Sequence, residues 1–100
     1  MLFVFHLIDR PDAAALRTEI RPAHKDYLSK VADRICVAGP LLSDDHSRML
    51  GSLLVIDFPD RTAAEAWIAA EPFTKAGVYG SSSISTFQNL WPQRTGVVAG

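Results

Sequence analysis

The middle of the chain holds four large apolar residues in unbroken succession, and this run limits the possible folds more than any other segment. They are Leu53, Leu54, Val55 and Ile56, within the segment 51–58. Successive side chains of a strand point to opposite faces, so a strand without polar positions is covered on both faces. The run is too short for a typical helix. We therefore expect 51–58 to form the central strand of a sheet that is buried on both sides.

Three other segments have the composition of strands. Residues 2–8 are rich in Phe, Val and Ile, and residues 35–38 form a second short apolar run. Residues 82–91 predict a last strand, because β-branched and aromatic residues favour extended structure. The polar stretch 43–48, which precedes the central strand, is typical of an exposed hairpin loop.

Helical periodicity occupies the two remaining regions. After Asp12, apolar residues recur at intervals of three and four, which is the stripe that a helix turns toward a core. Pro22 removes a backbone donor and favours the first turn of a helix, so we expect two helical pieces that meet beside His24. A further helix begins after Asp60, whose carboxylate can cap it, and ends at Pro72.

The predicted order is therefore βαββαβ, the arrangement of a ferredoxin-like sandwich. In this α+β fold, a four-stranded antiparallel sheet carries two helices on one face. The other face then lacks a cover within one chain, although the apolar central strand requires one. A second copy can supply that cover, so we expect a homodimer. Residues 1–92 account for one domain, and residues 93–100 are expected to form a flexible tail.

Charge and cysteine content exclude several classes of function. Ten basic and eleven acidic residues give a net charge of -1 and are scattered, so no surface for nucleic acid is predicted. The apolar opening, residues 1–8, is too short for a signal peptide or a membrane span, so we expect a cytoplasmic protein without a membrane partner. Cys36 has no partner for a disulfide or a zinc site and is expected to be buried.

Seven short motifs, taken together, resemble the YCII-related family. In chain order they are Arg21-Pro22-Ala23-His24 with Tyr27-Leu28, Ala38-Gly39-Pro40, Gly51-Ser52, Asp57-Phe58, Ala66-Trp67, Glu71-Pro72-Phe73 and Ala76-Gly77-Val78-Tyr79. The resemblance implies a dimeric α/β-barrel built from ferredoxin-like subunits, the architecture of muconolactone isomerases and chlorohydroquinol dehydrochlorinases. It also implies a pocket for a small-molecule ligand in which one histidine and one aspartate are taken as the catalytic residues.

The histidine of that pair falls on His24, in the matching motif, and Glu71 occupies the position of the aspartate. A carboxylate is kept, and its reach grows by one methylene group. His24 also lies on the core-facing stripe of its helix, where an imidazole needs a polar partner. The alternative for His24 is a core histidine bonded to a backbone carbonyl. The alternative for Glu71 is a solvated residue at a helix end.

Arg21, Ser52 and Tyr79 are the candidates for substrate binding. The resemblance implies that all three lie near the pocket, where a guanidinium or a hydroxyl group can bind an oxyanion or a carboxylate. Each also has a plain structural alternative: solvation, a strand start, or packing at a dimer interface. The spacing of His6 and His46 does not predict a metal site, and neither a metal nor a cofactor is expected.

Three functions remain open from the sequence. In the first, His24, oriented by Glu71, transfers a proton during an isomerisation or an elimination, such as a dehydrohalogenation, of a cyclic aromatic-derived substrate. In the second, the same pocket binds a small molecule or an anion without catalysis. In the third, the protein is a structural dimer with an inactive pocket, and the glutamate at position 71 is the feature that supports this reading.

Overall fold

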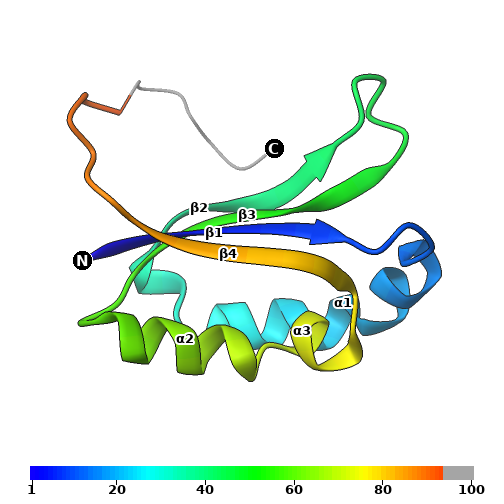
Figure 1. Cartoon of the computed structure of the whole chain (residues 1–100), viewed down its shortest axis with the longest axis horizontal. Helices are drawn as coiled ribbons and strands as arrows, with labels where there is room; N and C mark the ends of the chain where they lie inside the picture. Colours follow the sequence, from blue (N-terminus) through cyan, green and yellow to red (C-terminus); the bar gives the residue numbers. More distant parts are fainter. Residues whose placement is uncertain (94–100) are drawn as a thin grey trace.

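The computed structural model describes residues 1–93, which form one sheet with helices along one side (Figure 1). The elements are β1 (Leu2–Asp9), α1 (Ala14–Ser29), the 3-10 helix η1 (Ala32–Arg34), β2 (Ile35–Leu42), β3 (Met49–Asp57), α2 (Arg61–Ala69), α3 (Pro72–Ala76) and β4 (Tyr79–Phe87). The βαββαβ order is confirmed, with η1 and α3 as additional short elements. The predicted tail 93–100 lies outside the described residues except for Gln93. No helix within residues 1–93 is long and apolar enough to span a membrane.

The sheet has the strand order β2-β3-β1-β4, and every pairing is antiparallel. The apolar run 53–56 therefore lies in a central strand, as the sequence predicts, between β2 and β1. Figure 1 shows α1, α2 and α3 beneath one face of the sheet, and the other face carries no helix from residues 1–93. This arrangement is the ferredoxin-like sandwich expected from the sequence.

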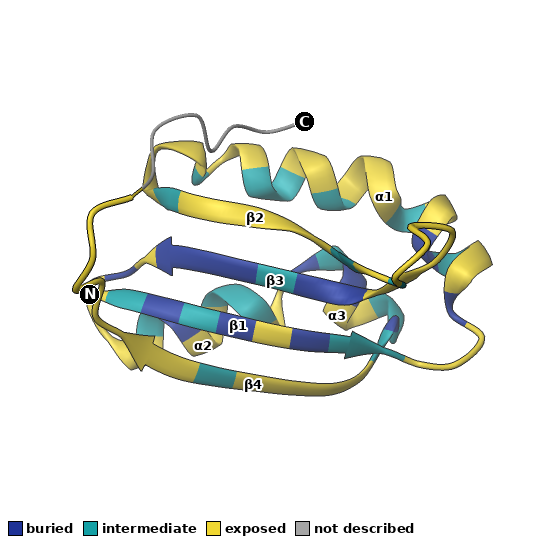
Figure 2. Ribbon diagram, turned by 90° about the horizontal axis from the view of Figure 1, so that it is seen from above, coloured by how far each residue is buried: buried dark blue, intermediate teal, exposed yellow. Residues whose placement is uncertain are grey.

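The main core lies between the two central strands and the helices. Its buried members are Phe3, Phe5, Leu7, Leu54, Ile56, Phe58 and Ala64. The register of β1 against β3 pairs Phe3 with Ile56 and Phe5 with Leu54, so these side chains share the covered face. The ring of Trp67, on α2, lies 5.6 Å from that of Phe5. Figure 2 shows burial concentrated in β1 and β3, whereas β2 and β4 are mostly exposed.

The prediction of two helical pieces around Pro22 was wrong, because α1 is one helix with this proline inside it. Pro22 has no N–H group, so the carbonyl of Thr18, four residues earlier, lacks its helical donor. Both residues are exposed, and water can therefore bind this carbonyl. Arg17 anchors the first half of α1 to the sheet, and His24 anchors the second half to the segment after α2. These contacts outweigh an interior proline, which costs about 3 kcal/mol.

Two expectations for the strands also need correction. The last strand begins at Tyr79, which pairs with Asp9, and ends at Phe87, so the predicted range 82–91 was placed too far along the chain. Cys36 is exposed rather than buried. It lies on the edge strand β2, at a point where the pairing register with β3 shifts, and such irregular positions turn side chains away from the core.

Local signals at the turns were informative. Asp60 accepts a hydrogen bond from the Ala63 backbone at 2.8 Å and caps α2, as predicted. Gly77 ends α3 with φ 80°, a left-handed conformation that glycine adopts without steric cost. The polar stretch 43–48 joins β2 to β3 as the expected hairpin loop, and most of its residues are exposed.

Candidate active site

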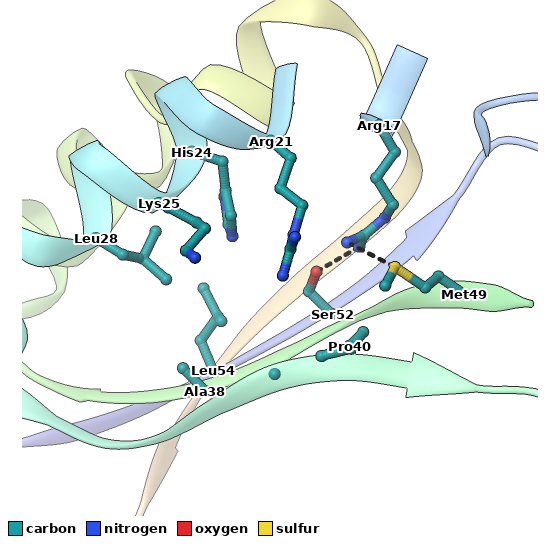
Figure 3. A pocket seen from close by; sticks show the side chains of 11 residues that line it. Arg17, Arg21, His24, Lys25, Leu28, Ala38, Pro40, Met49, Ser52 and Leu54 are labelled. Carbon is teal, nitrogen blue, oxygen red and sulfur yellow. Dashed lines mark hydrogen bonds between the residues drawn. The ribbon is translucent and has the colours of Figure 1, made fainter. Parts of the chain in front are cut away.

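A pocket of about 210 Å³ lies between α1 and the adjoining strands β2 and β3. Helix α1 contributes a basic wall that includes Arg21, His24 and Lys25, and β3 contributes Ser52 and Leu54. Figure 3 shows these α1 side chains extending toward the sheet, with the imidazole of His24 directed into the space between the two layers. The pocket is therefore basic on the helix side and mixed on the strand side.

His24 and Glu71 meet beside this pocket, although 47 positions separate them in the sequence. The Nδ1 atom of His24 lies 2.5 Å from Oε1 of Glu71. The Glu71 side chain has no exposed surface, and that of His24 is 13% exposed. The alternative of a solvated glutamate at a helix end is therefore wrong. The longer side chain spans the distance to the imidazole.

The position of Glu71 follows from the local sequence. Glu71 has an extended backbone and precedes Pro72, the first residue of α3, where a missing N–H has no cost. Its Oε1 also accepts a hydrogen bond from the Phe73 backbone at 3.1 Å and so caps α3. Its Oε2 has no partner among residues 1–93. A buried carboxylate is unfavourable without compensation, so the contact with His24 is its main stabilising interaction.

This contact fixes the roles of the two imidazole nitrogens. An ionised carboxylate can only accept hydrogen bonds, so when Glu71 is ionised the Nδ1–H group of His24 is the donor in this contact. In the neutral imidazole, the other nitrogen, Nε2, then has a free lone pair. It can take up a proton while Glu71 stabilises the resulting positive charge. The arrangement has the chemistry of an oriented general base.

Phe73 forms a platform that supports the site. Its ring stacks on the imidazole of His24 with a centroid separation of 4.0 Å and an interplanar angle of 11°. The guanidinium carbon of Arg17 lies 4.7 Å from the same ring centroid, a cation–π contact. The ring of Tyr79 meets it edge-on at 6.0 Å. Because Phe73 is fully buried, it restricts the positions of these three side chains.

Arg17, like Lys25 and Phe73, is a residue of the site that the sequence did not single out. It is only 7% exposed, and its guanidinium binds Asp9 Oδ2 at 2.9 Å and the Gly51 carbonyl at 2.9 Å. It also donates to Ser52 Oγ at 2.6 Å. One signal was available: Arg17 precedes His24 by seven residues, or two helical turns, and therefore lies on the same core-facing side of α1.

Ser52 is buried on β3 and is one of the residues that line the pocket. Its Oγ accepts one hydrogen bond from Arg17 and a second from the Tyr79 hydroxyl at 3.3 Å. A hydroxyl oxygen has two lone pairs, and both are occupied here. The hydroxyl proton of Ser52 has no acceptor among residues 1–93, so it is available to a ligand atom in the pocket.

The two tyrosines near Glu71 are held in their neutral form. Burial, followed by the negative charge of Glu71, raises the pKa of Tyr27, whose hydroxyl donates to the Trp67 carbonyl at 2.7 Å. Burial also raises the pKa of Tyr79 far above its usual value, although the hydrogen bond with Ser52 acts in the opposite direction. Both phenols are therefore hydrogen-bond donors at neutral pH, and neither is a base.

The structure brings four of the five candidates from the sequence to the pocket or its edge. His24, Arg21 and Ser52 line it, and Glu71 contacts His24 from behind. Tyr79 lies behind Ser52 rather than in the lining. Arg21 and the neighbouring Lys25 are exposed and make no ion pair within residues 1–93. The described chain contains no cluster of histidine, cysteine and acidic residues suited to a metal ion.

Sequence comparison identifies relatives over nearly the whole chain. Residues 1–88 match the YCII-related domain. Protein YciI of Escherichia coli O6:H1 (strain CFT073) is 33% identical, and the match covers 91% of this chain and 100% of that protein. An uncharacterized protein of Haemophilus influenzae is 26% identical over the same shares.

Structural comparison agrees with this. The 5-chloro-2-hydroxyhydroquinone dehydrochlorinase TftG of Burkholderia phenoliruptrix AC1100, solved in complex with 2,5-dihydroxybenzoquinone, superposes with a TM-score of 0.82 at 29% identity. The match covers 88% of this chain and 94% of that one. An antibiotic biosynthesis monooxygenase, at 15% identity and a TM-score of 0.52 over 90% of this chain and 99% of the other, shares the fold alone. The chain therefore belongs to the family of YCII-related domain proteins.

Proposed function

We propose that the protein is an enzyme in which His24 transfers a proton to or from a small cyclic substrate of aromatic origin. The observation that carries this proposal is the 2.5 Å contact between His24 Nδ1 and the fully buried Glu71, beside a pocket that His24 itself lines. The likeness to TftG, which is a dehydrochlorinase, supports an elimination as the reaction type.

The proposed reaction requires one base and one leaving group. In an elimination, His24 Nε2 takes a proton from the substrate, the electron pair left behind forms a double bond, and a halide ion leaves with the electrons of its bond. In an isomerisation, the same nitrogen returns the proton to a different atom of the ring. In both reactions, Glu71 acts as a positioning residue that holds the imidazole and stabilises its protonated form.

Three further groups are suited to the negative charge that develops on the substrate. The proton of the Ser52 hydroxyl has no protein acceptor within residues 1–93, and Arg17 and Tyr79 hold its oxygen in place. Arg21 and Lys25 add positive charge at the helix side of the pocket. Preorganised donors of this kind stabilise an oxyanion in the transition state. We assign Ser52 and Arg21 to substrate binding and Tyr79 to the positioning of Ser52.

A substitution that keeps the contact with Glu71 tests the role of His24. In His24→Asn, the amide nitrogen can replace Nδ1 as the donor to Glu71, but no second nitrogen remains to accept a proton. We expect chloride release from 5-chloro-2-hydroxyhydroquinone, measured under anaerobic conditions with a chloride electrode, to fall about 10²- to 10⁴-fold. His46→Asn, at an exposed loop position, is the matched control and should retain full activity.

Two outcomes would overturn this proposal. Equal turnover in wild type and His24→Asn would remove His24 from the chemistry. Saturable binding of hydroquinone or lactone compounds without any turnover would instead support the second candidate, a non-catalytic binding module. The basic wall formed by Arg21 and Lys25 is the observation that favours this alternative, because such a wall binds small anions without further chemistry.

We further propose that the protein is a homodimer in which the uncovered sheet faces pack together. On that face, Val55 of β3 pairs with Val4 of β1 and with Val37 of β2, its two neighbouring strands. Val37 is 39% exposed. Light scattering should give twice the chain mass of 10.9 kDa. Val55→Lys should yield the single-chain mass, whereas Thr62→Lys, on exposed α2, should not. A wild-type mass of one chain at micromolar concentration would contradict the dimer.

A further inference from the structure

A second and larger cavity adjoins the pocket and shares Arg17, Arg21 and Met49 with its lining. Its volume is about 720 Å³, within the range of about 300–1,000 Å³ that is usual for small-molecule sites. It is lined by the end of β1, the first half of α1 and the loop that leads into β3, elements that lie at the same end of the molecule in Figure 1. We call this cavity the arginine cleft.

The arginine cleft is strongly basic, although the chain as a whole has a net charge of -1. Arg10 in the loop after β1, Arg21 on α1 and Arg48 in the loop before β3 line it, are exposed, and have no ion-pair partner within residues 1–93. Asp9 is the one carboxylate in the described lining, and both of its oxygens accept hydrogen bonds from Arg17, at 2.9 and 3.4 Å. Three uncompensated positive charges therefore converge on the cleft.

The remaining lining of the cleft is largely apolar. Met49 and Leu50, at the start of β3, are 44% and 41% exposed, and both line the cleft with Ile8 and Pro11. Large apolar side chains that are exposed side by side mark surfaces where another molecule binds. A ligand that matches this lining has an apolar body as well as a negative charge.

The loop that carries Arg48 is held in a defined conformation. The Arg48 backbone donates to Ser43 Oγ at 3.0 Å, and its carbonyl accepts from the Ser43 backbone at 2.9 Å. Asp45 Oδ1 accepts hydrogen bonds from the side chains of Ser43 and Ser47 and from the Ser47 backbone. A wall that is ordered before binding loses less conformational entropy when the ligand arrives.

We propose that the arginine cleft is a binding site for an organic acid with an apolar body, whose carboxylate is bound by Arg10 and Arg48. The planar guanidinium group binds a carboxylate through two parallel hydrogen bonds, which suits this ligand. A phosphate ester can form the same hydrogen bonds, and a comparison of benzoate with phenyl phosphate separates the two kinds of ligand. The site does not require catalysis at His24.

The test is a titration of the ¹⁵N-labelled protein followed by NMR, with benzoate as the probe. Benzoate should shift the backbone signals of Arg10, Arg48 and Leu50, whereas benzyl alcohol, which lacks the charge, should bind about tenfold more weakly. Arg48→Gln and Arg10→Gln should each weaken benzoate binding about fivefold, the effect of about 1 kcal/mol from an exposed charge. Arg34→Gln, an exposed arginine outside the cleft, should leave benzoate binding unchanged.

The outcomes separate this site from the proposed activity. Tighter binding of phenyl phosphate than of benzoate, at the same residues, would keep the anion site and assign it to phosphate esters. No benzoate shift at millimolar concentration, or unchanged binding in the Arg10→Gln, Arg48→Gln double variant, would overturn the proposal. His24→Asn should retain benzoate binding, so a failure at the cleft and a failure of the catalytic proposal give different results.

Discussion

The charged side chains around the pocket beside His24 and the adjoining arginine cleft fall into two groups, buried and exposed. Glu71, behind the pocket, and Arg17, which lines both cavities, are buried, and each is held by at least two hydrogen bonds within the chain, whereas Arg21 and Lys25 are exposed. In the cleft, Arg10 and Arg48 are exposed and make no ion pair within residues 1–93. Buried charges require partners, so the loss of one partner is strongly destabilising, whereas exposed charges contribute little to stability and are free to bind a ligand.

The largest expected effect is at Phe73, the platform of the pocket. Phe73→Ala removes a fully buried ring that contacts His24, Arg17 and Tyr79, so it should lower the free energy of unfolding by about 3–5 kcal/mol. Leu50→Ala, in the cleft, removes a side chain that is 41% exposed and should cost less than about 1 kcal/mol. Urea denaturation measures both. Similar losses for the two variants would show that the cleft is as tightly packed as the pocket.

The second comparison is between two arginines. Arg17→Met leaves the buried Asp9 carboxylate without its cation and should destabilise the protein by about 3 kcal/mol or more. Arg48→Met, at an exposed position, should change the stability by no more than about 0.5 kcal/mol. For a domain of this size the first loss lowers the melting temperature by more than about 10 °C. Equal melting temperatures of the two variants would show that the buried and the exposed arginine contribute equally to stability.

Glu71→Gln should have a smaller effect on stability but a marked effect on the imidazole. The amide keeps an acceptor for the Phe73 backbone but loses the charge-assisted bond to His24, a loss of about 1.5–2 kcal/mol. An amide oxygen in the place of Oε1 accepts from both Nδ1 and the Phe73 backbone, so the tautomer is kept but the bond to the imidazole is weaker without the charge. The Nδ1 proton signal of His24 should therefore move upfield, and chloride release should fall. Glu65→Gln, which breaks an exposed pair with Arg61, should cost only about 0.5 kcal/mol and leave that signal unchanged.

The smallest effects concern pH, and they differ in sign between Asp45, in the loop beside the cleft, and Tyr79, behind the pocket. Hydrogen bonds from Ser47 and Ser43 lower the pKa of Asp45 from 3.8 to about 2, so their contribution is present above about pH 4 and is lost as the pH falls toward 2. Burial raises the pKa of Tyr79 above 10.0, so its contribution is present below pH 10 and is lost as the pH rises above it.

Two measurements check these opposite dependences. The backbone amide signal of Ser47 should move between pH 4 and 2 in wild type, as Asp45 is protonated, and not in Asp45→Asn. The urea midpoint of wild type should fall between pH 10 and 11 more steeply than that of Tyr79→Phe. Parallel alkaline curves would mean that Tyr79 is accessible to solvent and does not belong to the buried network.

Much of the fold and part of the site could be predicted because they depend on local patterns. The apolar run 53–56 predicted a central strand because alternation along a strand is a property of neighbouring residues. The three- and four-residue spacing placed His24 on the inner side of α1 for the same kind of reason. The match to family motifs singled out Glu71, whose contact with His24 across 47 positions no periodicity reveals.

The sequence by itself determined the order of the elements, the core-facing side of α1 and the capping of α2 by Asp60. Only the tertiary structure decided the continuity of α1 through Pro22 and the burial of Arg17. The partners of Arg17 lie eight residues before it, at Asp9, and 35 residues after it, at Ser52. The register of β1 against β3 brings these partners together, and the energy of that assembly outweighs the local preferences of an arginine for solvent and of a proline for a helix end.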